Sequence, residues 1–462
     1  MEQRTPRTRI DEVMGVVQRQ IEQRALTPGA RLPSVRAMAG RTGFSVSTVV
    51  EAYDRLVSEG SITARAGAGF YVVAPLAPLA LAEIGPVRSP HEDPLWLMRQ
   101  ALEARPGTLL PGGGWLPDSW MPDELLRKAM RPLTRTPSVR DMAVYGTPRG
   151  APGLRQLLAR RMLAHGIEAA PDQLALTESG THAIDLILRF LVEPGDTILL
   201  DDPCYFNFHA LLRAHRVEIV GVPMTPNGPD VAAFEAVLAA HRPRLYITNS
   251  AVQNPTGAIL SAATAHRILT LAEAHDLVIV EDDIFGDFED EPAPRLAALD
   301  GLQRVIRTGS FSKSLSSAVR LGYIAARPDW TAALADLRIA TSLSGSRIAA
   351  DLIHAMLSDG SYRRHMEKVR ARLAVSRQRV LGRLRGIGIQ PWLEPSAGIF
   401  AWCRLPAEKS AIEIARAGLE EGIIYAPGNA FSTGHNADRY MRINVATADD
   451  ERVFAHLARA CA

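Results

Sequence analysis

The stretch Ser310-Phe311-Ser312-Lys313 carries the residue of this chain best suited to covalent chemistry, a lysine next to hydroxyl side chains and followed by Arg320. A lysine amine forms Schiff bases with carbonyl compounds, and hydroxyl donors with a guanidinium bind phosphate. Residues 308–324 therefore predict that Lys313 holds pyridoxal phosphate, with Ser310, Ser312 and Arg320 on the phosphate. The same short pattern also fits an ordinary solvated lysine, so the rest of the chain must decide.

Three further motifs carry groups that fit such a site. Ser179-Gly180-Thr181 precedes a helix predicted to begin near His182. Backbone N–H groups at a helix N-terminus bind phosphate, although such a turn also serves as a plain cap. Asn254-Pro255-Thr256-Gly257 fixes a tight turn and presents an amide as a donor to a ring oxygen. Tyr205 is able to stack on a flat ring or to join the core.

An acidic run, Glu281-Asp282-Asp283, directly follows the apolar strand 278–280. A carboxylate at a strand tip is costly to desolvate, so it is either solvated or paired with a cation. The protonated ring nitrogen of pyridoxal phosphate is such a cation.

Composition narrows the class of protein. The chain has 462 residues and a net charge of +2, so it is not a polyanion binder as a whole, and any nucleic-acid surface must be local. Its 3 cysteines form no CxxC or Cys/His cluster, which argues against a disulfide framework and against a metal site. We expect a protein of the reducing cytoplasm, without a secretory signal. The longest apolar stretch, 70–82, is too short to cross a membrane and is broken by prolines.

The first seventy-odd residues predict helices followed by a hairpin. Ile10, Val13, Val17 and Ile21 recur at helical spacing, and Ser34 and Ser45 are N-cap residues for two further helices that end near Gly43 and Gly60. Residues 61–64 and 70–73 are strand-like, and a short glycine-containing loop separates them. The pattern indicates a helix-turn-helix with a hairpin wing, or a small helical cap with a hairpin.

Residues 29–36, 45–49, 52–56, 59–60 and 67–72 resemble, in order and spacing, the winged helix-turn-helix of GntR-type regulators. The resemblance implies that the second helix and the recognition helix bind the major groove of double-stranded DNA and that the wing follows the backbone. Residues 1–75 hold ten arginines and seven acidic residues, a modest basic excess, and Val46 stands where the family often has a basic residue. The residues that this places near DNA are Arg31, Arg36, Ser45, Ser47, Thr48, Arg65 and Gly67.

The chain changes character after residue 75. Residues 76–94 are proline-rich without a sustained period, which is typical of a semi-rigid linker. From residue 95 to 462, apolar runs alternate with amphipathic helical ones, which predicts a mostly parallel sheet covered by helices, with ligands at the carboxyl ends of its strands. The candidate strands are 197–200, 244–248, 277–280, 304–308 and 323–326.

The motifs of residues 95–462 resemble those of fold-type I aminotransferases, with pyridoxal 5'-phosphate as the cofactor. The resemblance implies that Lys313 forms the Schiff base, Asp282 pairs with the pyridinium, Asn254 donates to the phenolic oxygen and Tyr205 stacks on the ring. It also places Gly180, Thr181, Ser310 and Arg320 on the phosphate, and Arg442, from Met441-Arg442-Ile443, on the carboxylate of an amino-acid-like ligand. It further implies the fold of these enzymes, including a smaller C-terminal α+β subdomain.

Two further positions concern the partner subunit and the phenolic oxygen of the cofactor. The segment 145–155 is similar to one whose tyrosine reaches the partner's cofactor phosphate, so Tyr145 of the partner subunit would complete the site in a homodimer. Phe285 stands where the family usually has a tyrosine that contacts the phenolic oxygen, so one donor to the cofactor is missing.

Taken together, residues 1–75, the linker and residues 95–462 resemble the MocR class of GntR-family regulators. We expect an α/β protein that regulates transcription by binding a DNA operator and that senses an amine or amino-acid-like effector through Lys313. Two other interpretations stay open: a metabolic aminotransferase acting on an amino acid, and a structural homodimer with an inactive site. The effector, the operator and the direction of regulation do not follow from the sequence.

Overall fold

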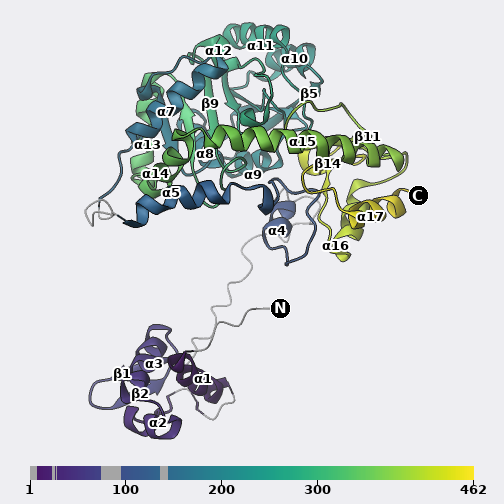
Figure 1. Ribbon diagram of the computed structural model, residues 1–462. Helices are drawn as coiled ribbons and strands as arrows, with labels where there is room; N and C mark the ends of the chain where they lie inside the picture. The colour runs from purple at the N-terminus through teal and green to yellow at the C-terminus, as the bar shows by residue number, and fades with distance from the viewer. Residues whose placement is uncertain (1–7, 23–25, 28, 74–94, 136–143) are drawn as a thin grey trace. The chain divides into compact units, whose positions relative to one another are not determined.

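The structure, a computed structural model, describes residues 8–22, 26–27, 29–73, 95–135 and 144–462 (Figure 1). Its contacts divide the chain into two units, Met1–Val87 and Arg88–Ala462, and each unit has its own apolar core. The predicted linker, residues 76–94, lies outside the described residues. The boundaries at 75 and 95 therefore stay a prediction.

The N-terminal unit contains α1 (Arg9–Glu22), α2 (Val35–Thr42) and α3 (Val46–Ser58). Ser34 Oγ accepts a hydrogen bond from the backbone N of Ala37, and Ser45 Oγ accepts one from the backbone N of Thr48, which confirms both predicted caps. Gly43 ends α2 in the left-handed conformation, as a C-terminal glycine does.

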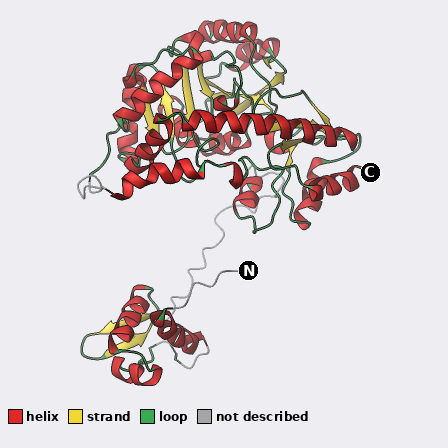
Figure 2. Ribbon diagram, viewed as in Figure 1, coloured by secondary structure: helices red, strands yellow, loops and turns green. Residues whose placement is uncertain are grey.

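The wing is the antiparallel pair β1 (Ile62–Arg65) and β2 (Gly69–Val72), shifted by one residue from the predicted strands. Figure 2 shows this pair beside the three helices. Tyr53 of α3 is fully buried, donates its hydroxyl to the carbonyl oxygen of Pro33, and packs edge-on against Phe70 of the wing. The core thus ties the wing to the recognition helix. It is built from Val13, Met14, Val17, Leu32, Met38, Val49, Ala52, Tyr53, Leu56, Ile62 and Val72.

The large unit is built on an eight-stranded sheet of order β3-β10-β9-β8-β7-β4-β5-β6. The neighbours from β9 to β5 run parallel, β10 is antiparallel to both of its neighbours, and β6 is antiparallel to β5. The five predicted strands are confirmed with ends that differ by one or two residues. The strands are β3 (Leu174–Thr177), β4 (Thr197–Asp202), β5 (Glu218–Thr225), β6 (Gly228–Pro229), β7 (Leu245–Thr248), β8 (Val278–Asp282), β9 (Val305–Ser310) and β10 (Gly322–Ala325).

Both faces of this sheet are covered. Alternation along β7 sends Tyr246 into one apolar cluster and Ile247 into the other. The cluster around Tyr246 contains residues of α7 (Pro152–Met162), α10 (Val231–His241), α11 (Ala262–Ala274), α14 (Arg347–Ser358) and α15 (Ser361–Gly386). The cluster around Ile247 contains residues of α8 (Gly180–Leu191), α9 (Phe206–Ala214) and α13 (Pro328–Ser342). Since side chains of central strands are buried on both sides, these strands appear in the sequence as continuous apolar runs.

A smaller C-terminal part surrounds a second, antiparallel sheet of order β11-β12-β14-β13. Its strands are β11 (Gln390–Pro391), β12 (Phe400–Arg404), β13 (Ala426–Pro427) and β14 (Tyr440–Asn444). The remaining described helices are α4 (Trp96–Leu102), α5 (Asp123–Arg135), α12 (Leu296–Asp300), α16 (Ala411–Glu420) and α17 (Glu451–Cys461).

No helix in the described part of the chain has both the length and the apolar character that a membrane-spanning helix requires.

The packing of the central sheet predicts that Ile247 is important for stability, because its side chain is fully buried between β7 and the helices of one face. Ile247→Ala should lower the free energy of unfolding by about 2–5 kcal/mol, because it leaves a cavity in a close-packed core. The control is Val375→Ala, which removes methyl groups from an exposed position of α15 and should change stability by less than about 0.5 kcal/mol. Urea unfolding followed by circular dichroism measures both, and equal effects would contradict the assignment.

Candidate cofactor site and nucleic-acid interface

The candidate cofactor residues gather at one edge of the large sheet. Tyr205, Asn254 and Lys313 follow the carboxyl ends of β4, β7 and β9, and Asp282 is the last residue of β8. Because β10 is antiparallel, its first residue, Gly322, lies opposite both Ser310 and Thr177 in the strand register. The sheet therefore brings together residues that are more than a hundred positions apart in the chain.

Helix α8 begins at this edge. It starts at Gly180, two residues earlier than predicted, with Ser179 Oγ accepting from the backbone N of His182 at 3.0 Å. A Cβ on Gly180 would lie 3.5 Å from Ser310 Cβ, and one on Gly322 would lie 2.7 Å from the backbone N of Gly180. The hydroxyl groups of Ser310 and Ser312 are hydrogen-bonded, with their Oγ atoms 3.0 Å apart. A helix N-terminus beside paired hydroxyls is a seat for an anion such as phosphate.

The other two phosphate candidates, Thr181 and Arg320, are exposed. Arg320 has a φ of 54°, a left-handed conformation, in the loop that returns to β10. Its positive charge helps to lower the pKa of Lys313, so the guanidinium lies within electrostatic reach of the lysine.

The three carboxylates at the end of β8 are all buried, yet their environments differ. Glu281 Oε1 accepts from the hydroxyl of Ser250 and from the backbone N of Leu296, the latter at 2.7 Å. Asp283 pairs with Arg295 and with Arg307.

Asp282 lies between these two paired carboxylates. Its Oδ1 atom is buried without a hydrogen-bond partner among the described residues. Asp282 is therefore the member of the run that offers a carboxylate oxygen to a ligand.

Burial dominates the pKa values of the two central groups. It raises the pKa of Asp282 to about 7, with a contribution from the charge of Asp283, while the Asn249 amide and Lys313 act in the opposite direction. Burial also lowers the pKa of Lys313 to about 8, and Arg442 and Arg320 lower it further against the effect of Asp282. An amine with this pKa is partly uncharged near neutral pH, which a nucleophilic lysine requires.

Arg442 of β14 is held by hydrogen bonds to Asn254 and to the backbone of Gly112. Its Nη1 donates to Asn254 Oδ1 at 2.9 Å and its Nη2 donates to the carbonyl oxygen of Gly112 at 2.7 Å. The guanidinium carbon lies 4.0 Å from the ring centre of Phe400 and 4.8 Å from that of Phe431. Burial lowers the pKa of Arg442 to about 9, so the side chain stays charged at neutral pH.

The two candidate tyrosines lie in different surroundings. Tyr205 packs edge-on against Phe206 and Phe208, and burial raises the pKa of its hydroxyl to about 12 while Arg442, Asp282 and Arg320 all influence it. It is thus part of an aromatic cluster and also near the charged groups of the site. Tyr145 is 78% exposed, next to Gly146, whose backbone N donates to Ser344 Oγ. Its role in a partner's site stays a prediction.

Phe285 is buried and its ring centre lies 5.4 Å from that of Phe400 and 6.0 Å from that of Phe288. Phe400 in turn lies against Arg442. The position predicted to lack a hydroxyl therefore contributes to the apolar support beneath the guanidinium.

Several site residues were not identified from the sequence. Gly112 has no room for a Cβ, which would lie 2.4 Å from the backbone N of Ala426, and a Cβ on Gly114 would lie 3.6 Å from Lys313 Nζ. The run Gly112-Gly113-Gly114 is the signal that a search for close backbone approach would have found. Asn249, whose amide donates to the carbonyl oxygen of Asp282 at 3.0 Å, has no local sequence signal.

The DNA candidates of the N-terminal unit lie at its surface. Arg31, Arg36, Ser45, Ser47, Arg65 and Gly67 are exposed, and Thr48 is half-buried. Ser45 Oγ lies 2.9 Å from Ser47 Oγ and 2.8 Å from Thr48 Oγ1 at the start of α3. Val46 is 49% exposed between them, so the first turn of the recognition helix presents hydroxyl groups and a valine.

On the wing, the Arg65 guanidinium stacks 4.4 Å from the ring centre of Tyr71, and Arg31 is bridged to Tyr71 through the backbone. Both arginines are therefore positioned by Tyr71 of β2, the strand that begins at Gly69. Arg36 belongs to α2 instead.

The buried carboxylate of Asp282 predicts a pH effect on stability. Its pKa is about 7 in the folded protein, above the value in the unfolded chain, so the folded state binds the proton more tightly. Below about pH 4 Asp282 is protonated in both the folded and the unfolded state, and its burial carries no charge penalty. As the pH rises from about 4 to about 7, the unfolded state loses this proton first, and the free energy of unfolding falls. In protein freed of cofactor, Asp282→Asn should therefore be more stable than the wild type at pH 8, on the order of 2–4 kcal/mol, and similar to it at pH 4.

Urea unfolding at pH 4, 6 and 8 measures this difference. The control is Asp283→Asn, which removes the counter-ion of Arg307 and one of the two counter-ions of Arg295, whose other is Glu289, and should destabilise the protein at pH 8. Parallel pH profiles for Asp282→Asn and the wild type would contradict the burial of an unpaired carboxylate.

Known proteins match both units. The family described as bacterial regulatory proteins of the gntR family matches residues 9–72, and the family of class I and II aminotransferases matches residues 118–459. The structure of LysN, an alpha-aminoadipate aminotransferase from Thermus thermophilus complexed with N-(5'-phosphopyridoxyl)-L-leucine, has a TM-score of 0.72 and 28% identity. That match covers 79% of this chain and 94% of the LysN chain.

Two relatives that match most of the chain are named as transcriptional regulators. The uncharacterised HTH-type transcriptional regulator YdcR of Escherichia coli is 30% identical, over 92% of this chain and 92% of its own length. The HTH-type transcriptional regulator NorG of Staphylococcus aureus is 28% identical, over 80% of this chain and 86% of its own length. The chain therefore belongs to the gntR-family transcriptional regulators that carry a class I and II aminotransferase domain, the MocR type.

Proposed function

We propose that this regulator holds pyridoxal phosphate on Lys313 and uses it to sense an amine or an amino-acid-like effector. The observation that carries the proposal is the buried Oδ1 of Asp282, which has no hydrogen-bond partner in the described part of the chain and lies within electrostatic reach of Lys313. A protonated ring nitrogen is the partner that this carboxylate lacks.

The remaining donors fit the other groups of the cofactor. Asn254 Oδ1 is already bonded to Arg442, which leaves the amide Nδ2 to donate to the phenolic oxygen. Tyr205 would stack on the ring. The phosphate would be held by Gly180, Thr181, Ser310, Ser312 and Arg320, and by Tyr145 of the partner subunit in a homodimer.

Bound pyridoxal phosphate supplies an aldehyde carbon that exchanges one amine for another. Lys313 Nζ would be the amine that an effector amine replaces, and it would take up the proton that the incoming amine gives up, so the exchange would need no oxidant or reductant. Arg442 would receive the effector carboxylate through its planar guanidinium.

Regulation then requires that the effector binds more tightly to one state of the protein than to another. A ligand shifts an equilibrium only by its difference in affinity for the two states. Release of Lys313 and occupation of Arg442 both change charge in a buried site, so they are suitable sources of that difference. The effector would thereby change the affinity for DNA.

A second candidate function is amino-acid transamination. It is favoured by the complete set of Lys313, Asp282 and Arg442, and by 28% identity to the 2-aminoadipate transaminase of Thermus thermophilus over 76% of this chain and 89% of that protein. Turnover of amino donors and keto acids at ordinary enzyme rates, without sequence-specific DNA binding at low salt, would select this alternative.

The cofactor proposal is tested by spectroscopy and trapping. Wild-type protein with added pyridoxal phosphate should absorb in the near-ultraviolet or visible, and borohydride should fix the cofactor to the peptide that contains Lys313. Lys313→Ala should abolish the covalent link and keep weaker binding through the phosphate, whereas Lys368→Ala, at an exposed lysine of α15, should behave as the wild type.

The sensing step uses the same proteins on DNA. An amine or amino acid that changes the absorbance of the wild type should change its DNA affinity, and Lys313→Ala should lose that response. A protein that takes up no cofactor, or a response that persists in Lys313→Ala, would overturn the proposal.

DNA reading is tested with a duplex from its own or a neighbouring promoter that carries two half-sites. Affinity should fall steeply as salt rises, because bound phosphates release counterions. Arg36→Ala should weaken binding to all sequences alike and reduce the salt slope by about 1 if Arg36 contacts phosphate, whereas Ser47→Ala should change sequence preference. Arg55→Ala is the control, since Arg55 pairs with Glu51 further along α3. Equal effects of all three variants would contradict these roles.

A further inference from the structure

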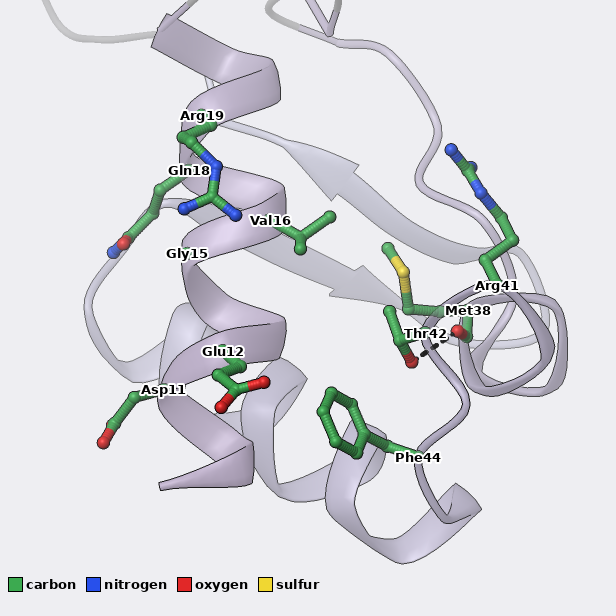
Figure 3. Close-up of a pocket in the computed structure, with 10 residues that line it drawn as sticks. All are labelled: Asp11, Glu12, Gly15, Val16, Gln18, Arg19, Met38, Arg41, Thr42 and Phe44. Atoms are coloured by element: carbon green, nitrogen blue, oxygen red, sulfur yellow. Dashed lines mark hydrogen bonds between the residues drawn. The ribbon is translucent and has the colours of Figure 1, made fainter. Parts of the chain in front are cut away.

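A groove of about 630 Å³ lies between α1 and α2 of the N-terminal unit, and none of the residues assigned to DNA lines it. Figure 3 shows Val16 of α1 and Phe44 pointing into it from opposite sides, with Glu12 before Val16 and Arg19 after it along α1. The residues that carry the argument are Glu12, Gly15, Val16, Arg19 and Phe44.

Gly15 stands in the middle of α1 without a structural reason in the described surroundings. Its φ is not positive, so the backbone does not need a glycine. A Cβ there would meet Arg19 Nη1 at 3.3 Å, the far end of a flexible side chain. A glycine inside a helix is destabilising relative to alanine. What the missing side chain leaves is a helix surface that another helix can approach closely.

The charges on either side of Gly15 are self-complementary. Glu12 lies three residues before it and Arg19 four residues after it. In an antiparallel pair of α1 helices that cross at Gly15, Glu12 of each helix comes beside Arg19 of the other, offset by one residue, or about 1.5 Å along the axis. No side-chain hydrogen bond or ion pair within the described residues occupies either group, and both lie at the edge of the groove.

We propose that α1 pairs antiparallel with α1 of a second copy of this chain, with Gly15 at the crossing point and the groove receiving Val16 of the partner helix. A single such contact is small, and it would be supported by the high effective concentration of two N-terminal units within one homodimer. That the pair spaces two DNA-reading surfaces rests on the proposed function. The pairing itself does not.

Cross-linking of the full chain tests the pairing without DNA. In a Cys461→Ser background, where Cys204 and Cys403 are buried, Gly15→Cys should form a disulfide-linked dimer on mild oxidation, because the disulfide traps the helix crossing covalently even though the added side chain weakens it. Gly40→Cys, at an exposed glycine of α2 outside the groove, should not.

Charge reversal then distinguishes a second copy from any other occupant. Glu12→Arg or Arg19→Glu alone should lower the cross-linking yield roughly three- to tenfold, and the two together should restore it, because the double reversal keeps the pair self-complementary. A partner of different sequence would not be restored. Failure of the double variant to recover, or equal yields at positions 15 and 40, would overturn the proposal.

Gly15→Ala gives an independent measurement if the cysteine variant fails to fold. It should raise the melting temperature of the N-terminal unit, since alanine favours the helix, and yet lower the DNA affinity for two half-sites relative to one. Gly40→Ala should raise the melting temperature alone. Cross-linking without DNA binding would refute the proposed function and keep the pairing, whereas DNA binding without cross-linking would do the reverse.

Discussion

Burial of three consecutive carboxylates at the end of β8 is the constraint on which the large unit depends. An uncompensated buried charge costs several kcal/mol, so each carboxylate must find hydrogen-bond donors, a cation or a proton. Asp283 is compensated by Arg307 of β9 and by Arg295 immediately before α12, and Glu281 by Ser250 and by the first backbone N–H groups of α12. These contacts fix the elements around Asp282 and leave its carboxylate for a ligand.

The sequence predicted the elements whose pattern is local. The apolar runs of β4, β7, β8, β9 and β10 were identified because central strands are buried on both faces. The caps at Ser34 and Ser45 were identified because a serine before a helix bonds its own first turn. β5 was not identified, since Gly221 and Pro223 interrupt its run, and the two-residue strands β11 and β13 each contain a proline.

In the candidate site, too, the features that follow from local sequence were predicted, and those that depend on distant contacts were not. The order of residue types along the chain was enough to indicate which groups follow which strands, and the structure places them at one edge. Which carboxylate stays unpaired does not follow from the order, because the arginines on Asp283 come from 12 and 24 residues away. The bond between Arg442 and Gly112 spans 330 residues, so no local pattern records it.

Gly322 shows what such packing means for the history of the chain. A Cβ at this position would lie 2.5 Å from the carbonyl carbon of Ser179, so any other amino acid would push the start of α8 away from the sheet. The residue carries no functional group, and backbone contact alone excludes its replacement. If this glycine stays the same in all descendants of the chain, the cause would be the close approach of two backbone segments and no chemical role of the residue itself. A lineage that lost its ligand would still inherit this glycine for as long as it kept α8 against β10.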